Sequence, residues 1–229
     1  MIGSIIGDIA GSTYEFHSIK AKDFPLFAPG SSYTDDSLMS IAVASALMQT
    51  GEGHDGFKSH VVTSMRQIAA KYPCPMGGYG GRFRHWLVSP HPRPYGSFGN
   101  GSAMRVSPCG DVAATLDEAL ELAKQSAEVT HNHPEGIRGA QAVAAAIYLA
   151  RTGESRDGIR SYIEQQALGN FSDIPWGVSE KFPETPSRRL FRHFRVGKSR
   201  FSPTKPSISL LELTKNPLEL SSLPFSDTL

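Results

Sequence analysis

Hydrophobic residues recur at helical spacing through the first 170 residues, and glycine-rich loops separate the periodic stretches. Residues 36–49 carry apolar side chains at positions 38, 41, 42, 46 and 47, which form one face of a helix. Similar stripes begin at Phe57 and Leu116, and a shorter one includes Ile159. Residues 139–150 are almost entirely apolar, so we expect that helix to be buried on most sides. Strand-like alternation is scarce, and the pattern predicts an all-α fold, a compact multi-helix bundle.

The pattern changes after about residue 182. Prolines interrupt any long helix in the remaining segment, and residues 187–205 carry only basic charges. We therefore expect a helical domain over residues 1–182 and a proline-rich, basic, irregular and poorly ordered tail over residues 183–229. The tail has three open interpretations: a solvated surface segment, an arm that binds phosphate or nucleic acid, or a non-native continuation of a truncated gene.

Composition limits the classes of function. The formal net charge is +1, which gives no overall electrostatic reason to expect nucleic acid or an anionic membrane as a partner. The two cysteines, Cys74 and Cys109, do not have the spacing of a metal site, and so small a number fits a reducing compartment. Asp8 and the lack of a basic leader argue against a signal peptide, and no apolar run reaches the roughly 20 residues that cross a bilayer. We expect a cytoplasmic protein.

The most informative polar segment is Tyr-Thr-Asp-Asp-Ser at residues 33–37. The carboxylates of Asp35 and Asp36 and the hydroxyl of Thr34 form an all-oxygen set, which suits Mg²⁺ or Mn²⁺ rather than zinc. The same three residues also suit a helix N-cap followed by an acidic first turn. The segment by itself leaves both interpretations open.

Three further segments combine small residues with polar ones. Residues 7–16 are mostly small and contain Glu15 near their end. They indicate either a closely packed first helix with a surface glutamate or part of a site. Glycines flank Asn100, and a similar loop spans residues 77–81. Such glycines predict positive φ angles and free N–H groups that cradle a phosphate or ribose, although plain turns have the same composition. His131 and His133 lack a third ligand at zinc spacing, which favours substrate hydrogen bonding or helix capping.

Four segments, taken in this order and spacing, form a joint pattern: Gly7-Asp8-x-x-Gly11 with Glu15, then Tyr33-Thr34-Asp35-Asp36, then Gly99-Asn100-Gly101-x-x-Met104-Arg105, then Thr130-His131. This pattern resembles the ADP-ribosylglycohydrolase family, which includes the dinitrogenase reductase-activating enzymes. The resemblance covers roughly residues 1–170. Each segment is weak evidence alone, whereas the combination is specific.

The resemblance implies a compact all-α enzyme with two Mg²⁺ ions, or Mn²⁺, at the base of an ADP-ribose cleft. Such enzymes hydrolyse the bond that joins ADP-ribose to a protein side chain or a small molecule, so the expected partner is an ADP-ribosylated protein or small molecule. Cleavage at the anomeric carbon develops positive charge on the ribose, which a nearby carboxylate stabilises. The resemblance assigns these roles: metal ligands Thr34, Asp35 and Asp36; catalytic Glu15; substrate-binding Gly99, Asn100, Gly101 and His131.

The sequence departs from the family at one place. The family pattern ends with a second acidic motif, Gly-Gly-Asp-x-Asp-Thr, which supplies the remaining metal ligands, and this chain has no such motif. Ser226, Asp227 and Thr228 match only its last three positions. Mg²⁺ prefers six oxygen ligands, so an incomplete set would weaken the site. The alternative to an active hydrolase is therefore a catalytically impaired or inactive relic that binds ADP-ribose.

Overall fold

The computed structural model describes residues 1–16, 19, 23–51 and 53–167. Within these residues the chain is helical, and the only β-type pairing is a single parallel bridge between Thr34 and Met76. The all-α prediction is thereby confirmed. The α-helices are α1 (Ile2–Gly11), α2 (Asp35–Thr50), α3 (Phe57–Lys71), α4 (Gly81–Val88), α5 (Ser107–Val112), α6 (Leu116–Glu128), α7 (Pro134–Arg151) and α8 (Arg156–Tyr162).

Polar side chains mark where several helices begin. The hydroxyl of Thr115 accepts a hydrogen bond from the backbone N–H of Glu118 at the start of α6, and Ser155 accepts one from Gly158 at the start of α8. His133 caps α7 in the same way, because its Nδ1 accepts from the N–H of Glu135 at 3.1 Å. These side chains satisfy N–H groups that have no partner inside the helix. The capping interpretation of His133 is confirmed.

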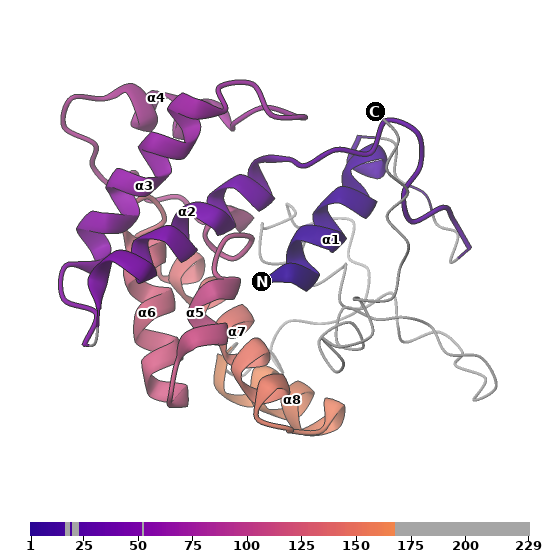
Figure 1. Ribbon diagram of the computed structural model, residues 1–229. Helices are drawn as coiled ribbons and strands as arrows, with labels where there is room; N and C mark the ends of the chain where they lie inside the picture. The colour runs from indigo at the N-terminus through magenta and orange to yellow at the C-terminus, as the bar shows by residue number, and fades with distance from the viewer. Residues whose placement is uncertain (17–18, 20–22, 52, 168–229) are drawn as a thin grey trace, which may run out of the picture.

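The helices pack around one core (Figure 1). α2 lies against α3 and α5, α6 lies against α7, and α1 lies beside α2. The core contains side chains with no exposed surface from α2, α3 and α5, among them Met39, Val43, Phe57, Met65 and Cys109. Burial of such side chains contributes on the order of 2 kcal/mol each, so this core fixes the positions of the helix ends and loops that surround it.

α5 and α7 approach each other more closely than two ordinary helices. A Cβ atom at Gly110 would lie 2.5 Å from the carbonyl oxygen of Ala144 and 2.9 Å from Cβ of Ile147. No side chain fits at that position without displacing one of the two backbones. The alanine-rich composition of α7 has the same effect, because small side chains let neighbouring helices come close.

The predicted helices correspond to α2, α3, α6, α7 and α8. The short helices α4 and α5 were not predicted, since their glycine, proline and aromatic residues carry no clear apolar period. The predicted domain boundary at residue 182 and the basic tail lie outside the described residues. In the part of the chain that is described, no helix is both long enough and apolar enough to cross a membrane.

Candidate functional site

The carboxylate of Asp8, in the last turns of α1, holds the beginning of α2. One oxygen accepts from the hydroxyl of Thr34 at 2.6 Å, and the other accepts from its backbone N–H at 2.9 Å. The second oxygen also accepts from the N–H of Ser37 at 3.2 Å and from its hydroxyl at 2.5 Å. Four donors from one helix start therefore converge on a single carboxylate. This places α1 and the first turn of α2 in a fixed relation.

Thr34 is the N-cap of α2, because its hydroxyl oxygen accepts from the N–H of Asp36 at 3.1 Å. The capping interpretation of the Thr-Asp-Asp segment is confirmed for this residue. The same hydroxyl donates its hydrogen to Asp8, so one lone pair of its oxygen has no protein partner in the described structure. Capping and a role as a weak oxygen ligand are therefore compatible.

Asp35 and Asp36 lie half-buried in the first turn of α2. Burial, with the charges of Glu15 and Asp8, raises the pKa of Asp35 to about 6. Burial, with the charges of Asp35, Asp8 and Glu15, raises the pKa of Asp36 to about 7. The charges that act on both residues are all negative. The fold thus holds a group of carboxylates that repel one another.

Glu15 lies in the same region, just beyond the C-terminal end of α1. A 3-10 turn, Ser12–Tyr14, follows α1 and leads directly to Glu15, whose pKa is raised by partial burial and by the charge of Asp8. Its Oε2 lies 3.2 Å from the place where a Cβ of Gly77 would stand. Gly77 and Gly78 have φ angles of +76° and +73°, which side chains rarely adopt. The glycine loop therefore passes close against this carboxylate.

Hard oxygen donors and an excess of negative charge are what a divalent cation requires. Asp35, Asp36 and Glu15 meet this chemical condition, since no basic group contributes to the electrostatics of any of them. In the described ranges, however, no three Asp, Glu, His or Cys side chains stand where together they could hold a metal ion. Asp8 is already occupied by its four donors. The described residues thus fit one side of a cation site.

A second group of candidate residues surrounds the 3-10 turn Asn100–Ser102. The carbonyl oxygen of Asn100 accepts from the N–H groups of Ala103 and Met104. The expectation of positive φ angles at Gly99 and Gly101 is wrong: Gly99 has φ −68°, and Gly101 lies within the right-handed turn. At Gly101 a side chain is excluded for a different reason. A Cβ there would stand 3.0 Å from Cε1 and 3.1 Å from Nε2 of His131.

His131 is only 5 % exposed and lies against this turn. Its Nδ1 is 2.7 Å from the hydroxyl of Thr130, and its ring packs against Tyr95 with centroids 6.0 Å apart. Burial, with the positive charges of Arg105 and Arg82, lowers the pKa of His131 to about 3. The imidazole is therefore uncharged at neutral pH and available as a hydrogen-bonding group.

Arg105 connects the Gly99–Gly101 turn to the end of α6 and to Thr130 through buried hydrogen bonds. Its guanidinium is 1 % exposed and donates to the carbonyl oxygens of Gly101 at 2.9 Å and Ser126 at 2.6 Å, and to the hydroxyl of Thr130 at 2.9 Å. Burial lowers its pKa to about 10, so it remains charged. The Asn100–Ser102 turn and the Thr130–His131 segment are thus both held by the guanidinium of Arg105.

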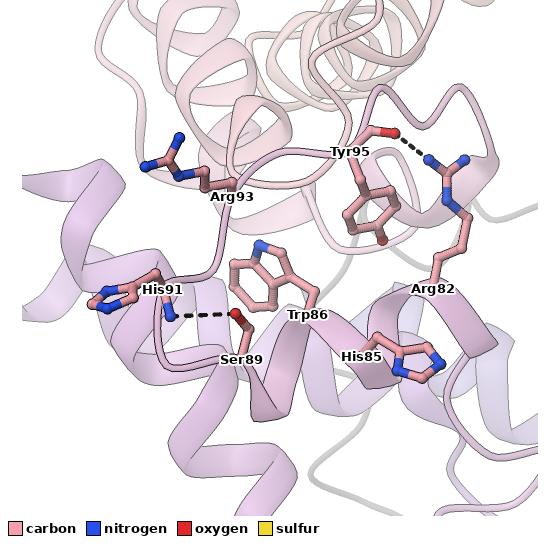
Figure 2. Close-up of a pocket in the computed structure, with 7 residues that line it drawn as sticks. All are labelled: Arg82, His85, Trp86, Ser89, His91, Arg93 and Tyr95. Atoms are coloured by element: carbon pink, nitrogen blue, oxygen red, sulfur yellow. Dashed lines mark hydrogen bonds between the residues drawn. The ribbon is translucent and has the colours of Figure 1, made fainter.

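Beside Tyr95 lies a pocket of about 380 Å³ between α4 and the segment that follows it (Figure 2). Arg82 donates to the carbonyl oxygen of Tyr95, and its guanidinium also lies 4.9 Å from the centre of the Tyr95 ring. Figure 2 shows the indole of Trp86 between these two chain segments. No acidic side chain lines the pocket, and its lining includes two arginines and two histidines: Arg82, Arg93, His85 and His91.

α2 connects the surroundings of the two groups of candidate residues. The hydroxyl of Ser40 donates to the carbonyl oxygen of Met104 at 3.3 Å, just beyond the glycine turn. Residues four apart on a helix share a face, so Asp36 and Ser40 lie on the same side of α2. The structure brings Glu15, Asp35 and Asp36 together, and separately brings Gly99, Asn100, Gly101 and His131 together. No hydrogen bond or ion pair joins the two groups among the residues described.

Sequence reasoning did not assign roles to Asp8, Ser37 and Arg105. The bonds of Asp8 cross 26 and 29 residues of chain, a separation that no periodic pattern reports. One signal was present in the charge distribution: residues 56–110 contain no Asp or Glu, although Lys and Arg occur throughout. This acid-free segment supplies the glycine loops, Arg105 and the basic pocket, next to a cluster of carboxylates.

Comparison with known proteins identifies the family of the chain. A model of the ADP-ribosylglycohydrolase family matches residues 1–200. ADP-ribosylhydrolase ARH3 of Homo sapiens is 29% identical over 206 residues, which cover 76% of this chain and 54% of that protein. ARH3 of Gallus gallus is 28% identical over 264 residues, with 100% of this chain and 66% of that protein covered. The chain thus spans between about half and two thirds of the length of these relatives. It belongs to the ADP-ribosylglycohydrolase family.

Proposed function

We propose that this chain hydrolyses the glycosidic bond that joins ADP-ribose to an acceptor group and releases ADP-ribose. The observation that carries the proposal is the cluster of Glu15, Asp35 and Asp36, whose pKa values are all raised by burial and by neighbouring negative charge. Family membership and the names of the relatives support the same reaction.

The oxygen chemistry of Asp35 and Asp36 suits one side of a site for a divalent cation, Mg²⁺ or Mn²⁺. Asp35 and Asp36 would bind it through carboxylate oxygens, and Thr34 has a free lone pair in the same turn. When bound, such an ion polarises water and ribose hydroxyl groups. The family resemblance implies a pair of ions, and a pair needs more carboxylates than the described residues provide. We therefore propose one cation beside the first turn of α2.

Glu15 is the group we assign to the reacting centre. Its raised pKa makes the carboxylate a better proton acceptor than an ordinary glutamate, which suits a group that orients and deprotonates water. Its negative charge also stabilises the positive charge that develops on the ribose ring as the glycosidic bond breaks. Gly77 keeps the space beside Glu15 free, since a side chain there would press against the carboxylate.

The turn at Gly99, Asn100 and Gly101 and the neutral His131 would hold the ADP-ribose. The acid-free segment around them suits a ligand with two phosphate groups, because no carboxylate there repels it. Arg105 keeps the turn and the histidine in place from below rather than by contact with the ligand, since it is almost completely buried.

The experiment is to measure release of ADP-ribose from peptides ADP-ribosylated on arginine or serine, with Mg²⁺ and with a chelator. We expect turnover that the chelator abolishes and that Glu15→Gln and Asp36→Asn each reduce by at least about a hundredfold. Asp55→Asn is the matched control, because it removes an exposed carboxylate that is not part of the cluster, and it should retain activity.

Failure of turnover in a folded sample would reject the hydrolase. If that sample still binds ADP-ribose, the chain is the impaired or inactive relative that the missing second acidic motif suggests. If it binds no ADP-ribose, both assignments are wrong. Equal turnover with chelator would remove the cation from the mechanism while leaving the hydrolase in place.

A further inference from the structure

The buried guanidinium of Arg105 and the imidazole of His131 are connected through one hydroxyl group. Arg105 Nη2 lies 2.9 Å from Thr130 Oγ1, and Thr130 Oγ1 lies 2.7 Å from His131 Nδ1. All three residues are almost completely inaccessible to solvent. Water therefore cannot substitute for a missing donor or acceptor in this chain of bonds, and each hydrogen must have a definite place.

The direction of each bond follows from the number of hydrogens available. A guanidinium only donates, so Thr130 Oγ1 must accept from Arg105. The hydroxyl then has one hydrogen left to donate, and His131 Nδ1 is its remaining partner in the described structure. If Nδ1 carried a proton, two donors would point at Oγ1 and the hydroxyl hydrogen would have no acceptor. The arrangement that satisfies all the groups leaves Nδ1 bare.

The other ring nitrogen faces the glycine turn. Nε2 of His131 lies 3.1 Å from the place where a Cβ of Gly101 would stand and 3.9 Å from that of Gly99. In the described part of the chain no hydrogen bond to Nε2 is present, and Nε2 is not among the buried polar atoms that lack a partner. Nε2 therefore reaches solvent at the turn where the proposed ligand would lie.

We propose that Arg105, acting through the hydroxyl of Thr130, fixes His131 as the tautomer with its proton on Nε2, so that the histidine presents a permanent hydrogen-bond donor at the Gly99–Gly101 turn. Arg105 and Thr130 are positioning residues in this scheme. The low pKa of His131, caused by burial and by the charges of Arg105 and Arg82, agrees with an uncharged ring.

The donor has a consequence for the ligand, and this step rests on the proposed function. An N–H group that stays neutral and fixed suits an acceptor oxygen of a phosphate or of a ribose hydroxyl. It disfavours a donor group, such as the amide or ammonium group of an alternative ligand, because two donors would then face each other. The tautomer thus selects for the oxygen-rich part of ADP-ribose.

The direct test is nitrogen NMR on the full chain labelled with ¹⁵N-histidine. The chain has eight histidines, and His131→Gln identifies the signal of His131 by its loss. We expect a ring with a bare Nδ1 and a protonated Nε2 that does not titrate down to about pH 5. A proton on Nδ1 in the wild-type protein would overturn the proposal.

Variants at Thr130 separate the tautomer from general disturbance of the core. Thr130→Val keeps the shape and removes the hydroxyl, so the His131 signal should shift toward the other tautomer or an exchanging mixture. Thr130→Ser restores the hydroxyl and should restore the Nε2–H form. Ser126→Ala is the matched control, because Ser126 is equally buried in α6, just before the turn that holds Thr130, and its hydroxyl has no partner. An unchanged tautomer in Thr130→Val would reject the role of the hydroxyl.

Binding of ADP-ribose, measured by calorimetry, tests the function of the donor. Thr130→Val should weaken binding by about tenfold, as loss of one hydrogen bond to a charged acceptor implies, whereas Thr130→Ser and Ser126→Ala should bind as the wild type does. If the wild-type protein has the expected tautomer but binds no ADP-ribose, the tautomer assignment stands and the proposed function fails. If Thr130→Val changes the tautomer of His131 but leaves the affinity for ADP-ribose unchanged, the role of His131 as a donor to the ligand is rejected.

Discussion

The carboxylate of Asp8 accepts two hydrogen bonds from Thr34, at 2.6 Å from its hydroxyl and at 2.9 Å from its backbone N–H. The same carboxylate accepts two more from Ser37. These bonds tie α1 to the first turn of α2, so the orientation of Asp35 and Asp36 depends on a residue about 27 positions earlier in the chain. Such bonds to a charged acceptor are stronger than those between neutral groups.

Asp8→Asn should destabilise the protein by about 2 kcal/mol, because an amide has only one acceptor oxygen for four donors. The change in the free energy of unfolding can be measured with urea at about pH 5, where repulsion from Asp35 and Asp36 is small. Asp55→Asn should change it by less than about 0.5 kcal/mol. Equal effects of the two substitutions would show that the four bonds contribute nothing specific.

Asp36→Asn should stabilise the protein in the presence of chelator. The folded pKa of Asp36 is about 7, above the ordinary 3.8, so the folded state takes up a proton. The corresponding stability is present below about pH 4 and is lost as the pH rises to about 7. The variant has no such loss, and its melting temperature should exceed that of the wild type at pH 7 but not at pH 4.

Addition of Mg²⁺ should reverse this order. The wild-type protein should gain melting temperature with Mg²⁺ because the cation offsets the repulsion between carboxylates, whereas Asp36→Asn should gain much less. A stabilised variant with an undiminished response to Mg²⁺ would place the cation elsewhere.

Gly101→Ala should weaken ADP-ribose binding by about tenfold or more, since a Cβ there would stand 3.0 Å from the ring of His131 and push it out of position. Gly110→Ala serves as the contrast. A Cβ at that position meets the backbone of Ala144, so it should cost about 1–3 kcal/mol of stability while the folded fraction keeps its affinity. Calorimetry on both variants, with their stabilities from urea unfolding, distinguishes the two effects.

His131→Gln should reduce the sensitivity of the protein to acid. The folded pKa of His131 is about 3, below its ordinary 6.5, so the unfolded state binds a proton that the folded state excludes. The corresponding stability is present above about pH 6.5 and is lost as the pH falls toward 3. The loss amounts to on the order of 2 kcal/mol at pH 5. Parallel stability curves for variant and wild type between pH 7 and pH 5 would contradict this assignment.

Helices that carry an apolar period were predictable from the sequence, because burial of one face is what generates the period. α4 and α5 were not, since Gly81, Pro108 and Gly110 interrupt any repeat and tertiary packing holds these short helices. The left-handed backbone expected at Gly99 and Gly101 was wrong. At Gly101 a Cβ would crowd the ring of His131, 30 residues later in the chain, whereas a Cβ at Gly99 would lie 3.9 Å from Nε2 of His131, an ordinary contact.

The candidate site shows the same limit. The types of residue in Thr34-Asp35-Asp36 indicated oxygen chemistry without any structure. The hydrogen bonds of Asp8 to that turn, and of Arg105 to Thr130 beside His131, join distant segments of the chain. Both residues stand in the joint sequence pattern, but the pattern does not indicate which residues they contact. The role of a residue that orients another residue can be recognised only from the contacts in the folded structure.

The acid-free segment of residues 56–110 also bears on how quickly a ligand arrives. Because the Lys and Arg residues of this segment have no acidic residue between them, the segment has a local positive charge that the net charge of only +1 for the whole chain does not reveal. An anionic ligand would be drawn to the basic pocket and glycine turns before it meets the carboxylates. Its association rate should therefore fall steeply as salt is added, while its dissociation rate changes little.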